Sequence, residues 1–261
     1  RYEVQHNADG PTGDAEGTIG RKGGYSIVDG TSISLNEVRK EGQLHRIGRE
    51  LIAIVAEGTT GRIYLQPTSD QTRIANVPQP EEVPDGKLPH NPRDFKTPNY
   101  GMTQWSDLFT NRQLTVLTTL ADTVAEIREH VLSDALAAGM AHGEPLDEGG
   151  TGSQAYADAI AVYLSLAVSR QTDRCSTINS WDSSRDTIRN VFARQAIPMT
   201  WDYAESNPFS SKSGNFLSQV EWVAEAVENV PATPLCEAHQ ADATTRDYTD
   251  VVVSTDPPYY D

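Results

Sequence analysis

Apolar residues at helical spacing dominate the middle of the chain. The first such run follows Thr110 and Asn111, either of which can cap a helix, and Gly139 ends it. Its apolar positions are Leu114, Leu117, Ala121, Val124 and Ile127. A second helix is predicted over 154–171. Because its apolar residues lie on several sides, we expect a central core helix.

Three shorter helices follow from the same pattern. Ser34 is a candidate N-cap for a helix over 35–41. A helix over 180–196 would end at Pro198. The last helix should open at Gly214-Asn215-Phe216 and run to about Asn229.

Strand-like runs lie near the two ends of the chain. Glycines punctuate residues 1–77, where the runs 51–56 and 62–65 flank a plausible hairpin turn. Near the C-terminus, 235–241 and 251–255 are predicted as strands. The second contains Val251-Val252-Val253 and should be buried on both faces.

These elements predict a mixed α/β fold in three parts. Residues 1–77 form a small β-rich unit, and residues 99–261 hold the helices and the two C-terminal strands. Between them, six prolines in 78–98 predict a linker or an extended segment lying on the surface, and we place a domain boundary there.

Charge and cysteine content narrow the candidate functions. The 261 residues carry a net charge of −16, whereas a DNA-binding surface should show clustered Lys and Arg. The one dense basic group is Arg39, Lys40, Arg46 and Arg49, which we interpret as a solvated face rather than a phosphate site. No apolar run reaches the roughly 18–20 residues of a membrane span.

The two cysteines indicate a cellular compartment, and the first residue bears on whether the sequence is a piece of a longer protein. Cys175 and Cys236 are far apart and lack a CxxC neighbour, which indicates a reducing compartment, the cytoplasm, and gives no support for zinc. The sequence starts at Arg1 rather than Met and stops just after a motif at 256–259. We therefore expect a piece of a longer protein.

That motif, Asp256-Pro257-Pro258-Tyr259, combines an acid, two prolines and an aromatic ring. The prolines fix their own φ and stiffen the loop at the carboxyl end of the predicted strand, where α/β sheets place ligands. Asp256 and the proline carbonyls can accept the hydrogens of an exocyclic amine while Tyr259 stacks on its ring, as for a flipped base. The alternative is a proline-rich turn that ends an ordinary strand.

The motif resembles the catalytic motif of S-adenosylmethionine-dependent amino-methyltransferases, which modify adenine N6 or cytosine N4 in DNA. Phe109-Thr110-Asn111-Arg112 is similar to the Phe-Thr-Pro-Arg segment that lies against the methionine end of the cofactor in many of these enzymes, with Asn111 in place of Pro. This resemblance makes Phe109 and Thr110 candidate cofactor contacts. A helix cap with an aromatic staple explains them equally well.

Asp242 and Ala243 follow the predicted 235–241 strand, and Asp242 lies 14 residues before Asp256. The spacing resembles the methyltransferase arrangement in which an acid at one strand end meets the adenine amine of the cofactor and the next strand carries the catalytic loop. Asp242 and Ala243 are thus further candidate cofactor contacts. The alternative for Asp242 is an N-cap or turn aspartate.

Taken together, segments across 99–261 resemble the bacterial adenine-specific DNA methylases of the DUF1156 group. The resembling segments are 99–102, 107–110, 192–209 and 256–261. The resemblance implies an incomplete Rossmann-like methyltransferase sheet, S-adenosylmethionine as cofactor, and DNA with a flipped base as partner. Residues 18–50 stand where the group often has a zinc-ribbon-like module but contain no cysteine, so no metal is implied. The main glycine-rich cofactor loop is absent, and we expect weak cofactor binding or none.

Two other functions stay open. The acidic composition and the missing cofactor loop also fit a non-enzymatic helical interaction domain. The same loop could instead grip an RNA base or a protein glutamine amide. The loop 199–209, with two acids and several aromatics, could bind an adenosine or a base, but we favour buried aromatic anchors.

Overall fold

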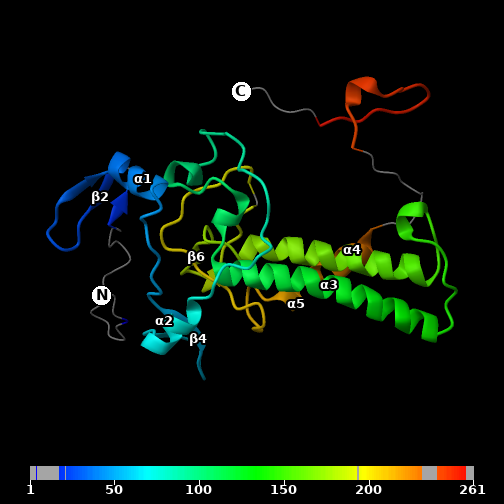
Figure 1. Ribbon diagram of the computed structural model, residues 1–261, viewed down its shortest axis with the longest axis horizontal. Coiled ribbons are helices and arrows are strands. Elements are labelled where there is room, and N and C mark those ends of the chain that lie inside the picture. Colours follow the sequence, from blue (N-terminus) through cyan, green and yellow to red (C-terminus); the bar gives the residue numbers. More distant parts are fainter. Residues whose placement is uncertain (1–3, 5–17, 21, 193, 231–239, 257–261) are drawn as a thin grey trace. The chain divides into compact units, whose positions relative to one another are not determined.

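The computed structural model describes residues 4, 18–20, 22–192, 194–230 and 240–256. It is a mixture of helices and small antiparallel sheets (Figure 1). The chain divides into two compact units, Arg1–Ala224 and Glu225–Asp261. This division differs from the boundary predicted at 78–98.

The start of the first unit is β-rich, as predicted. Strands β1 (Ile19–Gly20), β2 (Gly23–Tyr25) and β3 (Ser32–Ser34) form one antiparallel sheet. Helix α1 (Leu35–Gln43) begins at the predicted cap, with the Ser34 side chain accepting a hydrogen bond from the Glu37 N–H. The predicted hairpin is also confirmed, as β4 (Ile54–Glu57) pairs with β5 (Arg62–Leu65).

Helix α2 (Ser69–Ala75) is not predicted by apolar periodicity, because none of its residues is buried. Its signal is the capping box, in which Thr68 and Gln71 satisfy each other's backbone N–H groups. A Thr-x-x-Gln pattern could therefore have found it.

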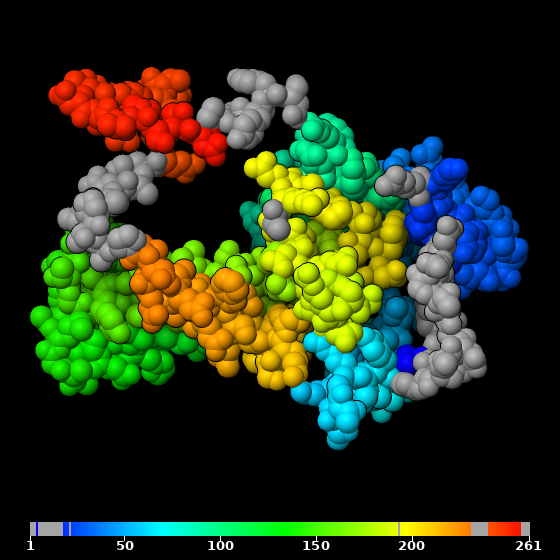
Figure 2. All heavy atoms as spheres, turned by 180° about the vertical axis from the view of Figure 1, so that it is seen from behind, coloured from blue at the N-terminus to red at the C-terminus, as the bar shows by residue number. Residues whose placement is uncertain are grey.

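The Pro-rich segment 78–98 lies along the first unit as an extended strap. Its Leu88 is buried in the core, and the Leu88 N–H donates to the Thr103 carbonyl at 2.8 Å. Further along, the Lys96 N–H donates to the Ile197 carbonyl at 2.8 Å. In Figure 2 this blue-green segment abuts the yellow loop that contains Ile197. Of the two predicted forms, the surface-lying segment is the one observed.

The two long helices were predicted at their observed places. Helix α3 (Asn111–Ala137) and helix α4 (Ser153–Gln171) lie side by side and antiparallel (Figure 1). Arg128 of α3 and Asp158 of α4 form an ion pair at 2.7 Å between them. Helix α5 (Phe216–Asn229) also matches its prediction.

Helix α4 is not the central core helix that its composition predicts. It buries small residues such as Ala157 and Ala167, while Tyr156, Val162 and Leu166 are half exposed. The core instead lies at the start of α3. It consists of Leu88, Leu108, Phe109, Leu114, Leu117, Ile178 and Ile197.

The helix predicted over 180–196 is wrong. Residues there form the hairpin β6 (Trp181–Asp182) and β7 (Thr187–Ile188). Asp182 accepts hydrogen bonds from the N–H and hydroxyl of Ser184, and Asp186 adopts a positive φ of 50°. Such side-chain bonds to nearby backbone compete with helix formation.

The buried strand predicted over 251–255 is also wrong, since these residues have no strand pairing and Val252 is 99% exposed. A strand gains its hydrogen bonds from a neighbour, and no described residue supplies one. The other predicted strand, 235–241, falls mostly outside the described residues. The second unit instead contains the end of α5 and one short turn of helix, η5 (Ala243–Thr245).

Candidate functional site

A cavity of about 300 Å³ opens beside the start of α3. Three segments line it: the loop after α1, the segment leading into α3, and the loop 199–203. Side chains that face it include Arg49, Tyr100, Phe109, Asn111, Trp201 and Tyr203. The cavity therefore joins the β-rich start of the chain to its helical middle.

Two glycines let the loop after α1 approach the other walls. A Cβ on Gly101 would lie 2.3 Å from the Gly42 carbonyl oxygen, and a Cβ on Gly42 would lie 2.6 Å from that of Tyr100. Gly101 also has φ of +88°, which disfavours other residues. The backbones at these two positions touch directly, and any side chain there would push the wall of the cavity away.

The predicted contacts Phe109 and Thr110 are neighbours in sequence but have different roles. Phe109 is 7% exposed, belongs to the core and lines the cavity. Thr110 is buried as the N-cap of α3: its hydroxyl accepts from the Gln113 N–H, and Gln113 Oε1 accepts from the Thr110 N–H at 2.8 Å. The predicted capping role of Thr110 is confirmed.

Arg112 is held by protein partners. Its guanidinium donates two hydrogen bonds of 2.8 Å to the two carboxylate oxygens of Glu205, and another to the Ala75 carbonyl. The Glu205 hydrogen bonds raise the pKa of Arg112. Arg112 therefore ties the start of α3 to the end of α2 and to the 199–206 loop, a role that the sequence does not reveal.

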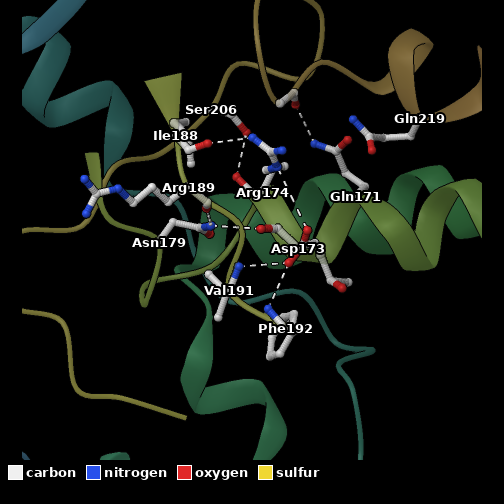
Figure 3. A network of polar contacts seen from close by, with 12 residues as sticks. Gln171, Asp173, Arg174, Asn179, Ile188, Arg189, Val191, Phe192, Ser206 and Gln219 are labelled. Carbon is white, nitrogen blue, oxygen red and sulfur yellow. Dashed lines mark hydrogen bonds and ion pairs between the residues drawn. The ribbon is translucent and has the colours of Figure 1, made fainter. Parts of the chain in front are cut away.

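Residues 173–206 contain a buried network of polar contacts, which we call the 173–206 frame (Figure 3). Asn179 is fully buried and makes four hydrogen bonds. Its amide donates to the Asp173 and Arg189 carbonyls at 2.9 Å, and its oxygen accepts from the N–H and hydroxyl of Ser176 at 2.8 Å. The carboxylate of Asp173 accepts from the N–H groups of Val191 and Phe192.

The frame is tied to the cavity through Thr177. Its N–H and hydroxyl both donate to the Leu108 carbonyl, at 2.7 and 2.9 Å. Nearby, the Thr200 hydroxyl donates to the Ile178 carbonyl. Because these bonds join residues just before α3 to the loop that carries Trp201, the frame fixes two walls of the cavity against each other.

The aromatic loop 199–209 does not act only as buried anchors. Trp201 packs edge-on against Tyr100, with ring centroids 5.2 Å apart, and both rings line the cavity. Phe209 is 83% exposed, so the anchor hypothesis is wrong for this residue. Burial raises the pKa of the Tyr203 hydroxyl, which keeps the phenol neutral at physiological pH.

Two charged side chains line the cavity, and they differ in their partners. Asp107 Oδ2 accepts hydrogen bonds from the Thr103 and Gln104 N–H groups at 2.7 and 2.8 Å. Arg49 makes no hydrogen bond or ion pair with any residue in the described part of the chain. Of these two side chains, Arg49 is the one without a direct hydrogen bond or ion pair to a described residue.

Cys175, which lies within residues 173–206, is not a candidate nucleophile. It is 1% exposed, and burial raises the pKa of its thiol to about 12. A thiol in that state is a poor nucleophile. Within the described ranges, no group of three or more His, Cys, Asp or Glu side chains could hold a metal ion.

The remaining predicted site residues belong to the second unit. Asp242 caps η5, accepting from the N–H and hydroxyl of Thr244 at 2.9 and 2.8 Å, and these bonds lower its pKa. Ala243 is the first residue of η5. Asp256 is exposed, while Pro257, Pro258 and Tyr259 lie outside the described residues.

Comparison with known proteins gives no relative: no family model, no curated protein and no solved structure matches the chain. None of the helices in the described part has the length and apolar run that a membrane crossing needs.

Proposed function

We propose that this chain is part of an S-adenosylmethionine-dependent methyltransferase that acts on an exocyclic amine of a DNA base, adenine N6 foremost. The observation that carries the proposal is the cavity in front of Phe109 and Asn111. It lies at the segment that resembles the methionine-end contact of the amino-methyltransferases. The second resemblance behind the proposal is the Asp256-Pro257-Pro258-Tyr259 motif.

The residues around the cavity fit one end of the cofactor. Small-molecule sites usually measure about 300–1,000 Å³, so a cavity of about 300 Å³ holds a portion of such a ligand. Phe109, Met102 and Met199 offer apolar and polarisable contacts, and Trp201 offers an aromatic one. These contacts suit the aliphatic chain and sulfur of a methionine group.

The proposed chemistry needs positioning more than a strong base. When bound, the cofactor supplies an electrophilic methyl group. Asp256 and a proline carbonyl accept the two hydrogens of the target amine and draw electron density onto its nitrogen, while Tyr259 stacks on the ring. Asp256 and the proline carbonyl would hold the amine nitrogen ready to receive that methyl group, and the proton that the nitrogen releases would pass to water. Alignment of the reacting atoms supplies most of the acceleration.

Methyl transfer by the full-length protein tests the proposal. The assay supplies cofactor labelled on its methyl group with unmethylated DNA, RNA or a glutamine-containing protein, and adenine N6 is the expected acceptor. Asp256→Ala should lose activity by roughly a hundredfold or more, since a positioned acceptor is worth about that much. Asp256→Asn keeps an acceptor oxygen, so its methyl-transfer activity should lie between that of the parent protein and that of Asp256→Ala.

Asp250→Asn is the matched control, because it removes the same charge from an exposed residue of the same unit and tolerates the positive φ of 59° there. It should methylate like the parent. Unchanged DNA methylation by Asp256→Ala would end the proposal, and labelling of RNA or glutamine alone would reassign the acceptor.

The exposed apolar side chains favour a second candidate, a non-enzymatic helical interaction domain. Leu217 and Trp222 of α5 are 72% and 59% exposed, and Leu166 of α4 is 53% exposed. Apolar side chains exposed on a helix can form part of a protein-binding surface when they make a contiguous patch. Absence of methyl transfer to all three acceptors by a folded full-length protein would favour this candidate.

A further inference from the structure

The loop that follows α1 forms one wall of the cavity, although it belongs to the β-rich start of the chain. His45 adopts a positive φ of 54°, and its N–H donates to the Gly42 carbonyl at 2.8 Å. The Arg46 N–H donates to the Glu41 carbonyl at 2.9 Å. These bonds turn the chain sharply at the end of α1, so that residues 47–49 run along the cavity.

Arg49 differs from Lys40 and Arg46, whereas Arg39 likewise forms no ion pair with a described residue, and its Nε is buried without a partner. Lys40 pairs with Glu37, and Arg46 forms two hydrogen bonds with Glu41, so both charges are compensated on or beside α1. Arg49 lines the cavity, and in the described part of the chain it has no acidic partner. Arg49 is exposed, as a solvated face predicts, and it also lines the cavity.

The other polar groups of the cavity make hydrogen bonds to residues other than Arg49. The Asp107 carboxylate accepts two backbone N–H groups on the side of Thr103 and Gln104. The Asn111 amide donates to the Val77 carbonyl at 3.0 Å. Arg49 acts on the Tyr203 hydroxyl, where its positive charge offsets part of the rise in pKa that burial causes. The Arg49 guanidinium thus interacts electrostatically with one residue of the cavity wall, Tyr203.

We infer that Arg49 binds the carboxylate at the methionine end of the cofactor, so that the β-rich N-terminal unit completes the cofactor site. This inference rests on the proposed function. A guanidinium forms strong charge-assisted hydrogen bonds with a carboxylate and can bind both of its oxygens. One cation beside aromatic and thioether walls suits the carboxylate and the aliphatic chain of that end, which also bears a charged α-amino group.

A nucleic-acid phosphate is the competing occupant, and the surroundings favour it less. Binding a phosphate backbone takes several cations along a groove. Here one unpaired cation lies among aromatic residues, in a chain of net charge −16. A single carboxylate therefore fits better than a run of phosphates.

Ligand-observed NMR with the 261-residue chain tests the inference. The probes are S-adenosylhomocysteine, which has the carboxylate, and 5′-methylthioadenosine, which lacks the whole amino-acid end. Arg49→Gln should weaken S-adenosylhomocysteine binding about tenfold, as expected for one charged hydrogen bond, and leave 5′-methylthioadenosine unchanged. Arg46→Gln is the matched control, since it removes an equal charge outside the cavity and should change neither affinity.

Three results would overturn the inference. Equal binding of both probes, unaffected by Arg49→Gln, would remove the carboxylate contact and leave the proposed function standing. Binding of a short DNA strand, but of neither probe, in an Arg49-dependent way would assign Arg49 to phosphate. If neither probe binds the folded chain, Arg49 does not hold the cofactor in this chain, and the Asp256 methyl-transfer assay then decides the proposed function by itself.

Discussion

Two regions without an α-helix, 173–206 and 240–256, are both rich in short polar side chains. The hydrogen bonds of these side chains span very different sequence separations. In the first, Thr177 bonds to Leu108 and Thr200 to Ile178. In the second, every side-chain hydrogen bond between described residues stays within five positions, as with Thr249 and Asp247 or Tyr248 and Ala243. The same residue types build a buried frame where other segments supply partners, and isolated turns where none do.

The difference predicts that the 173–206 frame carries stability and that 240–256 does not. All four tryptophans, residues 105, 181, 201 and 222, belong to the first unit. Tryptophan fluorescence during chemical denaturation therefore reports on that unit, and far-UV circular dichroism, which follows the helices of both units, is recorded with it for the predictions that follow.

The largest loss of stability is expected for Asn179→Ala. The change leaves the Asp173 and Arg189 carbonyls and the Ser176 N–H without their partner in a fully buried place. Each buried unsatisfied group costs about 1–3 kcal/mol, so unfolding should become easier by about 3 kcal/mol or more. Asn207→Ala, an exposed control that loses one bond to the Phe209 N–H, should cost less than about 1 kcal/mol. Similar losses for the two variants would contradict the role of the frame.

A matched pair of valines tests the comparison directly. Val124 in α3 is 8% exposed and Val252 is 99% exposed. Val124→Ala should cost about 1–2 kcal/mol, because two buried methyl groups are lost. Val252→Ala should stay within about 0.5 kcal/mol. A larger effect at Val252 would show that the valine run packs against something after all.

The valine run also shows what the sequence could not provide. The positions of α1, α3, α4 and α5 were predictable because caps and periodicity are local: Ser34, Thr110 and Gly139 lie within or next to the helices that they delimit. A strand depends on a neighbour, and the run 251–255 has the composition of a buried strand without any described partner. Composition alone therefore predicted a buried strand where the described residues are exposed and unpaired.

The candidate site was predictable to a similar extent. The resemblance selected Phe109, which does line the cavity, whereas Arg49 carried no local signal of its place. Arg49 lies at the cavity because Gly42 and Gly101, two residues far apart in sequence, let the loop after α1 approach the other walls. Contacts of that kind are invisible to spacing and motif.

A smaller effect is expected for the link between Arg112 and Glu205. A double-mutant cycle with Arg112→Gln and Glu205→Gln should give a coupling of about 1 kcal/mol, because the pair is doubly hydrogen-bonded and partly buried. The exposed pair Arg73 and Asp70, with side chains 72% and 80% exposed, is the control and should couple by less than about 0.5 kcal/mol. Equal couplings would argue that Arg112 does not join α3 to the aromatic loop.

The smallest effect should appear only in acid, at the β6–β7 hairpin of the frame. Hydrogen bonds from Ser184, then Arg189, lower the pKa of Asp182 from 3.8 to about 2. A carboxylate with a depressed folded-state pKa stabilises the fold above its unfolded-state pKa, and this stabilisation is lost as the pH falls through the folded-state value. The stability difference between the parent and Asp182→Asn should therefore be constant above about pH 4 and shrink towards pH 2. Asp202→Asn is the charge-matched exposed control, and a difference for Asp182→Asn that persists unchanged to pH 2 would show that the carboxylate charge does not stabilise this hairpin.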